Sequence, residues 1–391
     1  MTELNTSAPT EEIPRADQPG QTVAVWDLPL RFFHWSMVIV GVTAAVTGFL
    51  APTWWLDIHI LSGYAISILL LFRIIWGLMG SHYSRYKNFI LYPPKVIAHI
   101  RNLIDRSAGP SLGHNPVGAW VIVGLMFSLS LMVLSGLIGL GGQEKLGPFA
   151  FILSFETGVR ALSVHEFFSW ALLFLVLTHF MGVVVEQRVF KHPVISAMVT
   201  GDVPVGDYQA AGNQAAPVTK KHTTIGAAIF VLVSTSAILI GISLSNKPAF
   251  GYTQIALPET YASECGDCHD AYHPSLRTSA AWKNILGTLE DHFGEDASLD
   301  DATIQEIAHF TSQQGAENFD TEVSHLVGRV DTESRRMTDT AFWKKRHQDI
   351  DDTIFAQSSV GSKVNCNACH SDAPIGRFDD SNIHIPQGNL P

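Results

Sequence analysis

The sequence is poor in charged residues and in cysteine. Charged residues fill 16% of its 391 positions and hydrophobic residues 47%, whereas a typical soluble domain has about 25% charged residues. This composition excludes a disordered chain, a collagen and a small disulfide-stabilised protein, and the shortage of charge indicates membrane spans. All four cysteines lie in two C-x-x-C-H strings, at residues 265–269 and 366–370. No cysteine is therefore left over for a disulfide, a zinc site or a nucleophile.

Charge is distributed unevenly along the chain. Residues 1–246 hold 14 Lys and Arg against 13 Asp and Glu, whereas residues 247–391 hold 11 against 23. The last third therefore carries a net charge of −12, which excludes a nucleic-acid-binding protein. Its acidic surface either keeps this part soluble or docks it to a basic soluble partner.

The first 246 residues contain five long apolar runs. Each has about 19–24 residues, enough to cross roughly 30 Å of hydrocarbon at about 1.5 Å per residue. Helices buried in soluble proteins rarely stay apolar over such lengths, so we interpret the runs as transmembrane helices. The predicted spans are Phe32–Leu50, Ile58–Met79, Val117–Leu140, Leu162–Val185 and Thr224–Leu244.

Lys and Arg in the connections between spans predict the orientation. The connections after the second and fourth spans hold nine basic residues: Arg85, Lys87, Lys95, Arg101, Arg106, Arg188, Lys191, Lys220 and Lys221. The connections after the first and third spans hold two, Lys145 and Arg160. We therefore expect a multi-pass protein of the bacterial inner membrane, with a cytoplasmic N-terminus and, after five spans, a periplasmic C-terminal domain.

These features divide the chain into five segments. Residues 1–22 are polar and lack the basic start of a signal peptide, which predicts a disordered cytoplasmic tail. A four-helix membrane domain at 23–200, a cytoplasmic loop at 201–222, a fifth transmembrane helix at 223–246 and a periplasmic domain at 247–391 follow. The predicted fold class is all-α, a transmembrane helical bundle followed by a mainly α-helical periplasmic domain.

The two C-x-x-C-H strings predict two covalently bound haems. In this motif two thiols add to the two vinyl groups of haem, and the adjacent imidazole binds the iron. A thioredoxin-like redox pair would need a βαβ setting, and none is visible. Haem c is attached on the outer face of the bacterial membrane, in agreement with the charge rule. The predicted attachment sites are Cys265, Cys268, Cys366 and Cys369, and the proximal ligands are His269 and His370.

The second axial ligand of each c haem is predicted to be histidine. Residues 247–391 hold eight histidines but a single methionine, Met337. Because His/Met ligation raises the reduction potential, bis-histidine ligation predicts rather low potentials. His292 lies 23 residues after His269, and His347 lies 23 residues before His370. The candidates are His273, His292, His309, His325, His347 and His384.

Four further histidines, His34, His59, His165 and His179, lie inside or at the ends of the spans. Intramembrane histidines are costly and mark functional sites by default. His165 and His179 are 14 residues apart, which places them on nearly the same helix face and about 21 Å apart along the axis. That spacing suits two stacked haems, one near each membrane surface.

Depth in the membrane predicts how these histidines pair. His34 and His179 lie toward the inner surface, whereas His59 and His165 lie toward the outer one. Hydrogen bonding between helices is the alternative role for such residues. The other histidines of this half are interpreted as structural; they are His82, His99, His114, His192 and His222.

The membrane half resembles the b-type cytochrome subunit of Ni/Fe-hydrogenases and its bacterial cytochrome b561 relatives over about residues 23–200. The resemblance rests on Val25-Trp26-Asp27-x-Pro29-x-Arg31-x-x-His34-Trp35, His59-x-x-x-Gly63-Tyr64, Phe72-Arg73-x-x-Trp76-Gly77, Gly113-His114-Asn115-Pro116 and His165-Glu166. That family carries two b haems on one histidine from the first span, one from the second and two from the fourth. The resemblance therefore implies the same pairing as depth does.

The C-terminal part resembles the dihaem cytochrome c domain family over nearly all of residues 258–387. The matching residues are Cys265–His269, Trp282, Asp291–Glu295, Trp343-x-x-Arg346-His347 and Asn365–His370 followed by Gly376-x-Phe378-Asp379. Both haems of that family are bis-histidine ligated, which implies His292 and His347 as the distal ligands. Which of them serves which haem stays open, and His273 stays a competitor for the second haem.

Charged residues near the spans are weaker candidates. Arg31, Arg73 and Arg160 either pair with haem propionates or are membrane-surface residues. Glu166 and Glu186, at opposite ends of the fourth span, either accept a proton from a quinol or are simply solvated.

Together these features predict a membrane-bound tetrahaem electron carrier with two b and two c haems. It would link the quinone pool, with quinone as substrate, to a periplasmic cytochrome or redox enzyme, in the manner of a quinol:cytochrome c oxidoreductase. The second hypothesis is a membrane anchor and electron-transfer subunit of a periplasmic dehydrogenase, such as a hydrogenase or formate dehydrogenase. The third is a ferric reductase or haem-based sensor, although no kinase or regulatory segment supports a sensor.

Overall fold

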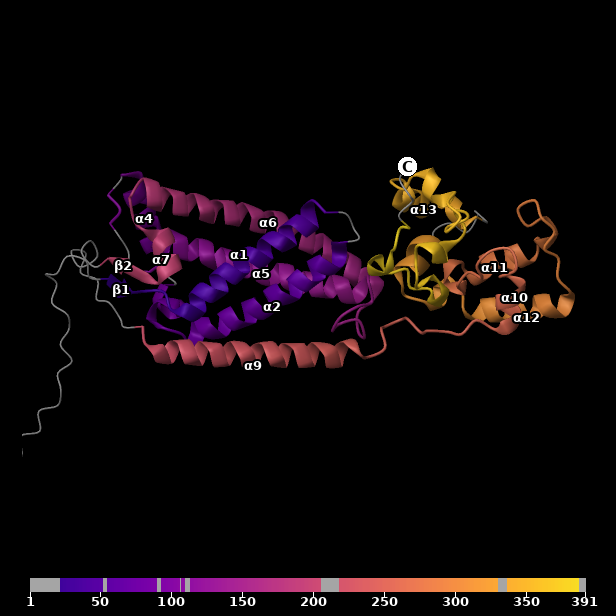
Figure 1. The fold of residues 1–391 in the computed structure, drawn as a ribbon, viewed down its shortest axis with the longest axis horizontal. Helices are drawn as coiled ribbons and strands as arrows, with labels where there is room; N and C mark the ends of the chain where they lie inside the picture. Colours follow the sequence, from indigo (N-terminus) through magenta and orange to yellow (C-terminus); the bar gives the residue numbers. More distant parts are fainter. Residues whose placement is uncertain are drawn as a thin grey trace, which may run out of the picture. The chain divides into compact units, whose positions relative to one another are not determined.

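The computed structural model describes residues 22–51, 55–89, 93–105, 107–109, 113–204, 218–329 and 336–386. The predicted tail, except for Thr22, and residues 205–217 of the predicted loop lie outside the described residues, as does Arg106. Within them the chain is mostly helical, with few strand residues, so the predicted all-α class is confirmed (Figure 1).

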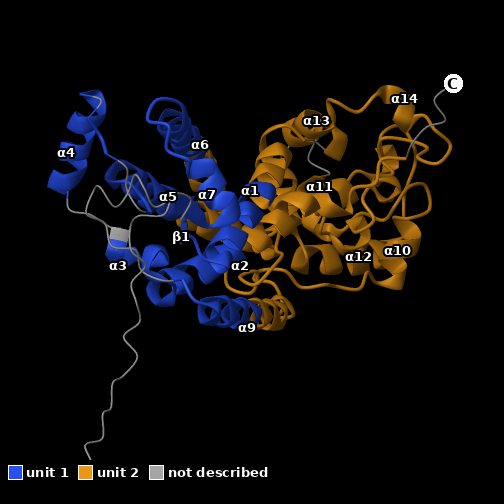
Figure 2. Cartoon of the chain, turned by 60° about the vertical axis from the view of Figure 1, so that its left-hand side comes forward, with its two compact units in different colours: residues 1–39, 68–129, 170–233 blue, residues 40–67, 130–169, 234–391 orange. Residues whose placement is uncertain are grey.

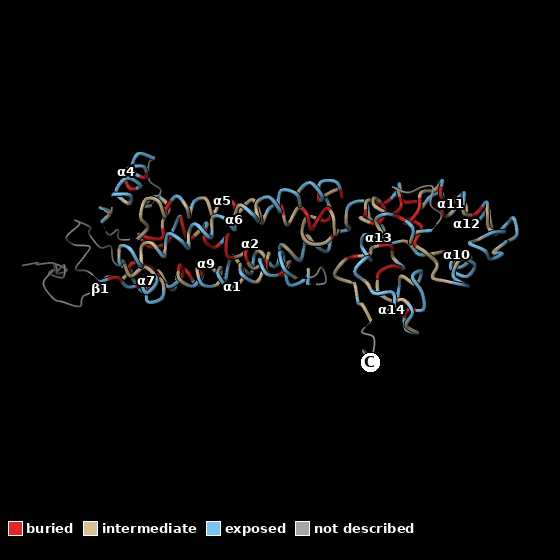
Figure 3. The backbone as a smooth tube through the Cα atoms, turned by 90° about the horizontal axis from the view of Figure 1, so that it is seen from above, coloured by how far each residue is buried: buried red, intermediate tan, exposed pale blue. Residues whose placement is uncertain are grey.

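Among the described residues, five helices are long and apolar enough to cross a membrane, as predicted. The most apolar window of α6 is 0% buried and that of α2 is 33% buried, and Figure 3 shows mostly exposed or intermediate residues along the long helices. Apolar side chains exposed on this scale mark a surface that faces lipid. The chain is thus a multi-pass membrane protein, with spans α1 (Leu28–Phe49), α2 (Leu56–Met79), α5 (Pro116–Gly142), α6 (Phe155–Arg188) and α9 (Lys220–Ser245).

Each of these helices begins earlier than the apolar run that predicted it. α6 begins seven residues before the predicted Leu162, and its first turn contains Glu156; the first turn of α2 contains Asp57. A hydropathy run stops at such residues, but the backbone hydrogen bonds continue, and an acid in the first turn is favoured by the helix dipole.

The described chain forms two compact units, and the five long helices contribute residues to both (Figure 2). Unit 1 comprises residues 1–39, 68–129 and 170–233. Strand β1 (Thr22–Ala24) pairs with β2 (Asp202–Pro204) in antiparallel register. The hydrophobic core of unit 1 consists of Val25, Trp26, Leu30, Phe33, Leu69, Phe72, Trp76, Tyr83, Ala197 and Val203. Its short elements are η2 (His82–Ser84), α3 (Tyr86–Phe89), α4 (Pro93–Ile104) and α7 (Val194–Thr200).

Unit 2 comprises residues 40–67, 130–169 and 234–391. After α9 the chain forms short helices around two small cores, one with Tyr261 and Ile307 and one with Leu276 and Val323. The α-helices are α10 (Glu259–Glu264), α11 (Ser279–Leu286), α12 (Asp301–Gln313), α13 (Ala341–His347) and α14 (Asp352–Phe355). The single turns are η3 (Pro274–Leu276), η4 (Leu289–Asp291), η5 (Ala316–Asn318), η6 (Ser324–Gly328), η7 (Met337–Asp339), η8 (Cys366–Ala368), η9 (Ala373–Ile375) and η10 (Asp380–Asn382).

Candidate haem sites

His59 on α2 and His165 on α6 face each other in unit 2. Their ring centroids are 6.1 Å apart and the rings are nearly perpendicular, at 81°. Two imidazoles that bind one metal ion from opposite sides have centroids roughly 6 Å apart, because each metal–nitrogen bond is about 2.0–2.1 Å. The pair therefore fits one iron between its rings.

Backbone carbonyls fix both rings of this pair. His59 Nδ1 lies 3.1 Å from Ala44 O, and His165 Nδ1 lies 2.8 Å from Met132 O. A histidine that binds a metal usually donates its other N–H in this way, which sets the tautomer and the ring orientation. Each Nε2 is thereby left for a metal.

Two glycines make room for these rings, a contribution that sequence reasoning missed. A Cβ atom at Gly48 would lie 3.0 Å from the His59 ring, and one at Gly136 would lie 3.0 Å from the His165 ring. Small residues let helices approach closely in membranes. The sequence signal that could have indicated this role is a glycine inside the first and the third apolar runs.

His34 on α1 and His179 on α6 both lie in unit 1. His34 Nδ1 is buried without a hydrogen-bond partner among the described residues. His114, interpreted from sequence as structural, lies in the same unit. Burial lowers the pKa of His114 to about 3, and its ring contacts Trp26 at a centroid distance of 4.7 Å.

Asp27, which sequence reasoning counted only as part of a family pattern, fixes the start of α1. Its carboxylate caps the helix by accepting from Leu30 N at 2.8 Å, the usual role of an N-cap aspartate. Trp76 Nε1 and the hydroxyls of Ser81 and Ser84 also donate to it. This buried network sets the helical position of His34, seven residues later.

The C-terminal part brings each C-x-x-C-H histidine to one distal candidate. His269 lies opposite His292 with ring centroids 6.3 Å apart, and His370 lies opposite His347 at 6.1 Å. Both distances fit one iron, by the same metal–nitrogen geometry. Each candidate thus faces a different C-x-x-C-H histidine.

Backbone carbonyls again orient one ring in each of these pairs. His269 Nδ1 lies 2.8 Å from Asp270 O, and His347 Nδ1 lies 2.9 Å from Trp343 O. The Trp343 ring also stacks on His347, with centroids 4.3 Å apart. Sequence reasoning counted Trp343 only as part of a family pattern, but here it positions the ligand.

The cysteines beside these pairs are not arranged as nucleophiles. Burial, with help from Glu264, raises the pKa of Cys265 to about 11. Burial, with help from Asp270, raises the pKa of Cys366 to about 12. Reactive thiols have lowered pKa values in electropositive surroundings. Cys265, Cys268, Cys366 and Cys369 are all free thiols and fit thioether attachment of haem.

The other distal candidates have different surroundings. His273 is 1% exposed and packs on Phe319, with ring centroids 5.2 Å apart. Its Nε2 is buried without a hydrogen-bond partner. The remaining three contact polar neighbours: His309 contacts Gln313, His325 contacts Asp320 and His384 contacts Asn382 O.

Replacing Met337 by leucine should leave the spectra of both c haems unchanged. Met337 packs against the core of Leu276, Val323 and Val327, and a Met-to-Leu exchange in a core usually costs less than about 1.5 kcal/mol. Oxidised-state absorption spectra check this expectation. The bis-histidine assignment fails if the wild type shows an iron–methionine band that the variant loses.

The three candidate arginines lie in different environments. Arg31 donates to Val199 O, and its Nε is buried without a partner. Arg73 is 2% exposed, donates to Ser84 O and lies over the Tyr86 ring. Arg160 is exposed and pairs with Glu156 at 3.3 Å. The first two have the burial expected of propionate partners.

The two candidate carboxylates also differ. Glu166 is exposed on α6. Glu186 is partly buried, accepts from Asn115 Nδ2 at 2.6 Å and pairs with His192 Nδ1 at 2.6 Å. His192, interpreted from sequence as structural, is thus placed to exchange a proton with Glu186.

The membrane half is similar to known b-type cytochromes. A "Probable Ni/Fe-hydrogenase B-type cytochrome subunit" of Bradyrhizobium diazoefficiens is 26% identical over 46% of this chain and 85% of its own length. The protein of that name from Cupriavidus necator is 25% identical over 45% of this chain and 85% of its own length. A "Probable Ni/Fe-hydrogenase 1 B-type cytochrome subunit" of Escherichia coli K12 is 24% identical over 45% of this chain and 88% of its own length.

The C-terminal part is similar to solved dihaem cytochromes. A diheme cytochrome c from Rhodobacter sphaeroides has 27% sequence identity and a TM-score of 0.28, covering 32% of this chain and 98% of that one. A diheme cytochrome type c from Shewanella baltica OS155 has 31% identity and a TM-score of 0.27, covering 33% and 95%.

Two family matches cover most of the chain, and both were expected from sequence motifs. One is described as "Prokaryotic cytochrome b561" and the other as "Dihaem cytochrome c". Both families imply haem, b-type in the first segment and c-type in the second. Residues 25–201 thus belong to the prokaryotic cytochrome b561 family and residues 261–378 to the dihaem cytochrome c family.

Proposed function

We propose that the chain is a membrane-bound tetrahaem cytochrome, with two b and two c haems, that links the quinone pool to a periplasmic redox partner. The observation that carries this proposal is the set of paired histidines. Three pairs have ring centroids 6.1–6.3 Å apart, and the fourth proposed pair consists of His34 on α1 and His179 on α6, both in unit 1. When bound, haem iron supplies one-electron transfer.

The protein's own residues hold these groups. His34 with His179 and His59 with His165 are the proposed axial ligands of the b haems. The proposed c-haem ligands are His269 with His292 and His370 with His347, and the attachment sites are Cys265, Cys268, Cys366 and Cys369. The proposed propionate partners are Arg31, Arg73 and Arg160.

The proposed topology follows the distribution of basic residues. Nine Lys and Arg in the connections after the second and fourth spans, against two in the others, favour a cytoplasmic N-terminus in the inner membrane. The C-terminal domain then lies in the periplasm, where c haems are attached. Its net charge of −12 over residues 247–391 suits a basic soluble electron carrier as partner.

Quinone is the proposed membrane substrate, with Glu166 or Glu186 as proton acceptor. The surroundings of Glu186 favour it over Glu166, since a carboxylate bonded to histidine has a route for the proton.

A second candidate function is a membrane anchor and electron-transfer subunit of a periplasmic dehydrogenase. The relatives of the membrane half are named as Ni/Fe-hydrogenase b-type cytochrome subunits, and these names favour the anchor function. The fused dihaem domain argues against it mildly, because that domain takes the place such an enzyme would use.

Purified full-length protein separates the two functions. A pyridine haemochrome assay should give about two b and two c haems per chain, and a quinol should reduce the c haems of the isolated protein. Co-purification with a large metalloenzyme, together with no quinol-driven reduction, would establish the anchor instead. A chain that carries c haem alone would contradict the proposed membrane sites.

A further inference from the structure

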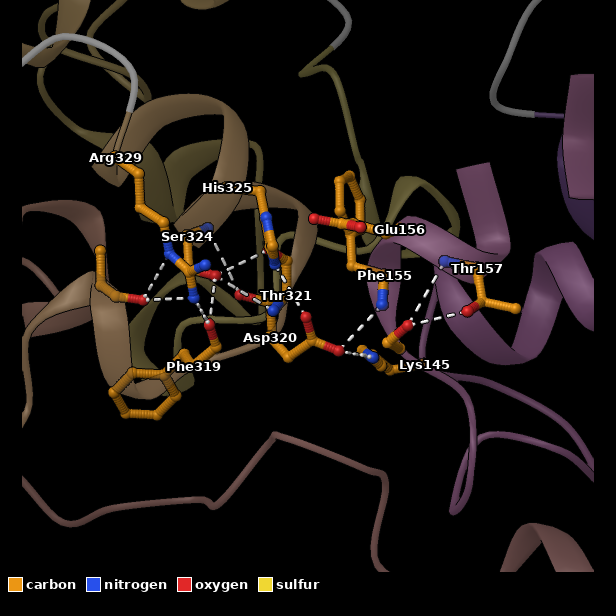
Figure 4. A network of polar contacts seen from close by, with 12 residues as sticks. Lys145, Phe155, Glu156, Thr157, Phe319, Asp320, Thr321, Ser324, His325 and Arg329 are labelled. Atoms are coloured by element: carbon orange, nitrogen blue, oxygen red, sulfur yellow. Dashed lines mark hydrogen bonds and ion pairs between the residues drawn. The ribbon is translucent and has the colours of Figure 1, made fainter. Parts of the chain in front are cut away.

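One carboxylate of the dihaem part holds the loop between α5 and α6, and all the residues involved lie in unit 2. Asp320 Oδ2 accepts from Lys145 Nζ and from Phe155 N, both at 2.8 Å (Figure 4). Phe155 is the first residue of α6, so the carboxylate also meets a helix N-terminus, which favours negative charge. The contact is buried: the Lys145 side chain is 3% exposed and that of Asp320 is 18% exposed.

The other side of Asp320 is equally well anchored. His325 Nε2 lies 2.8 Å from Oδ1, and the His325 ring stacks on Phe155 with centroids 4.5 Å apart. Asp320 N donates to Gly251 O at 2.7 Å. Gly251 has φ +65°, and a Cβ there would lie 2.3 Å from Asp320 Cβ, so only glycine fits.

The segment that carries Asp320 is itself held firmly. Arg329 donates to the carbonyls of Ala316 and Phe319, and Ser324 donates to Phe319 O (Figure 4). Burial would raise the pKa of Asp320, but hydrogen bonds from Lys145, Phe155 N and His325 outweigh it and lower the pKa. The carboxylate is therefore ionised at neutral pH and able to pair with Lys145.

A second contact joins the same loop to the second C-x-x-C-H motif. Arg377 Nη2 donates to Glu144 O at 3.1 Å, and Arg377 lies seven residues after His370. Its neighbour Phe378 contacts the His370 ring, with centroids 5.4 Å apart. Arg377 therefore contacts the loop, and the next residue, Phe378, contacts the proposed ligand His370.

Two ion pairs lead from this contact toward the other proposed ligand of the same c-haem site. Arg377 pairs with Asp379 at 2.7 Å. The next residue, Asp380, pairs at 2.5 Å with Arg346, which precedes His347 in the chain.

We propose that Asp320 and Arg377 are positioning residues: Asp320 holds the dihaem part against the loop between α5 and α6, and Arg377 holds the Cys366–His370 motif beside the same loop. This inference rests on the proposed function. It assigns the second c-haem site to electron exchange with the outer b-haem site at His59 and His165, and leaves the first for the soluble partner. The exchange oxidises one site by one electron and reduces the other by one, so no further reactant is needed.

Stopped-flow reduction of the full-length holoprotein with a quinol tests the proposed positioning role of Asp320. In Asp320→Ala and Lys145→Met, reduction of the b haems should keep its rate, whereas the following reduction of the c haems should slow by about ten-fold or more, since misplacement of reacting groups is costly. The matched control is Asp296→Ala, which removes an exposed acid that accepts hydrogen bonds from Ser298.

Two further measurements separate positioning from damage. Direct reduction of the c haems by dithionite should be equally fast in all variants, and their potentials should match the wild type. If Asp320→Ala transfers electrons to the c haems at the wild-type rate, the positioning role is overturned. If the wild type itself transfers no electrons from b to c haems, the proposed function fails instead.

Removal of one c haem at a time tests which motif lies beside the membrane domain. Cys366→Ala/Cys369→Ala should stop reduction of the remaining c haem by the b haems. Cys265→Ala/Cys268→Ala should remove the other c haem and still allow the b haems to reduce the one that remains. The opposite result in the two double variants would overturn the assignment. Absorption spectra of the c band confirm that each retains its other haem.

Discussion

Replacing His165 by alanine is expected to remove one b haem and to leave the other b haem and both c haems bound. His165 faces His59 across 6.1 Å, a separation that fits one iron, and the b haems are held only by non-covalent contacts and axial bonds. The pyridine haemochrome ratio should therefore fall from about two b per chain to about one, with the c content unchanged.

His179→Ala supplies the matched variant, because it removes the partner of His34 in the other membrane pair. Each variant should retain a different b haem, so redox titration should show two different midpoint potentials. His222→Ala is the control, since that residue belongs to none of the proposed pairs and its side chain contacts Thr219. Loss of both b haems in each variant would show that the two sites do not form independently.

The sequence predicts the membrane pairs because helical geometry leaves little choice. His165 and His179 lie on one long helix, and the position of a histidine along an apolar run gives its depth in the bilayer. Depth then decides which residues can meet. The structure places the His59 ring opposite that of His165.

The distal histidines of the C-terminal part were harder to assign for a physical reason. Residues 247–391 form short helices and single turns, so spacing along the chain says little about distance in space. The mirror-like placement of His292 and His347 was compatible with either pairing. Only the tertiary contacts bring His292 to His269 and His347 to His370.

Several supporting residues could not be predicted because their roles depend on partners far away in sequence. Asp27 meets Trp76, Ser81 and Ser84. Asp320 meets Lys145, 175 residues earlier. A buried acid of this kind has no periodicity and no local motif to mark it.

Replacing His347 by alanine is expected to convert one c haem from low-spin to high-spin while that haem stays covalently attached. The iron of the Cys366–His370 site would keep His370 and lose its second imidazole. About half of the c-type low-spin signal should disappear from the electron paramagnetic resonance spectrum, and the total c-haem content should not change. His292→Ala should have the same effect on the other haem.

The pairing itself can be tested in a chain that lacks one c haem. In Cys366→Ala/Cys369→Ala the remaining haem is bound by the first motif, where His292 faces His269. His292→Ala should convert this haem to high-spin, whereas His347→Ala should leave it low-spin. The reverse outcome would require the crossed pairing, His347 with His269, and would contradict the geometry of both sites. His309→Ala serves as control, because that exposed side chain bonds Gln313 on the same helix.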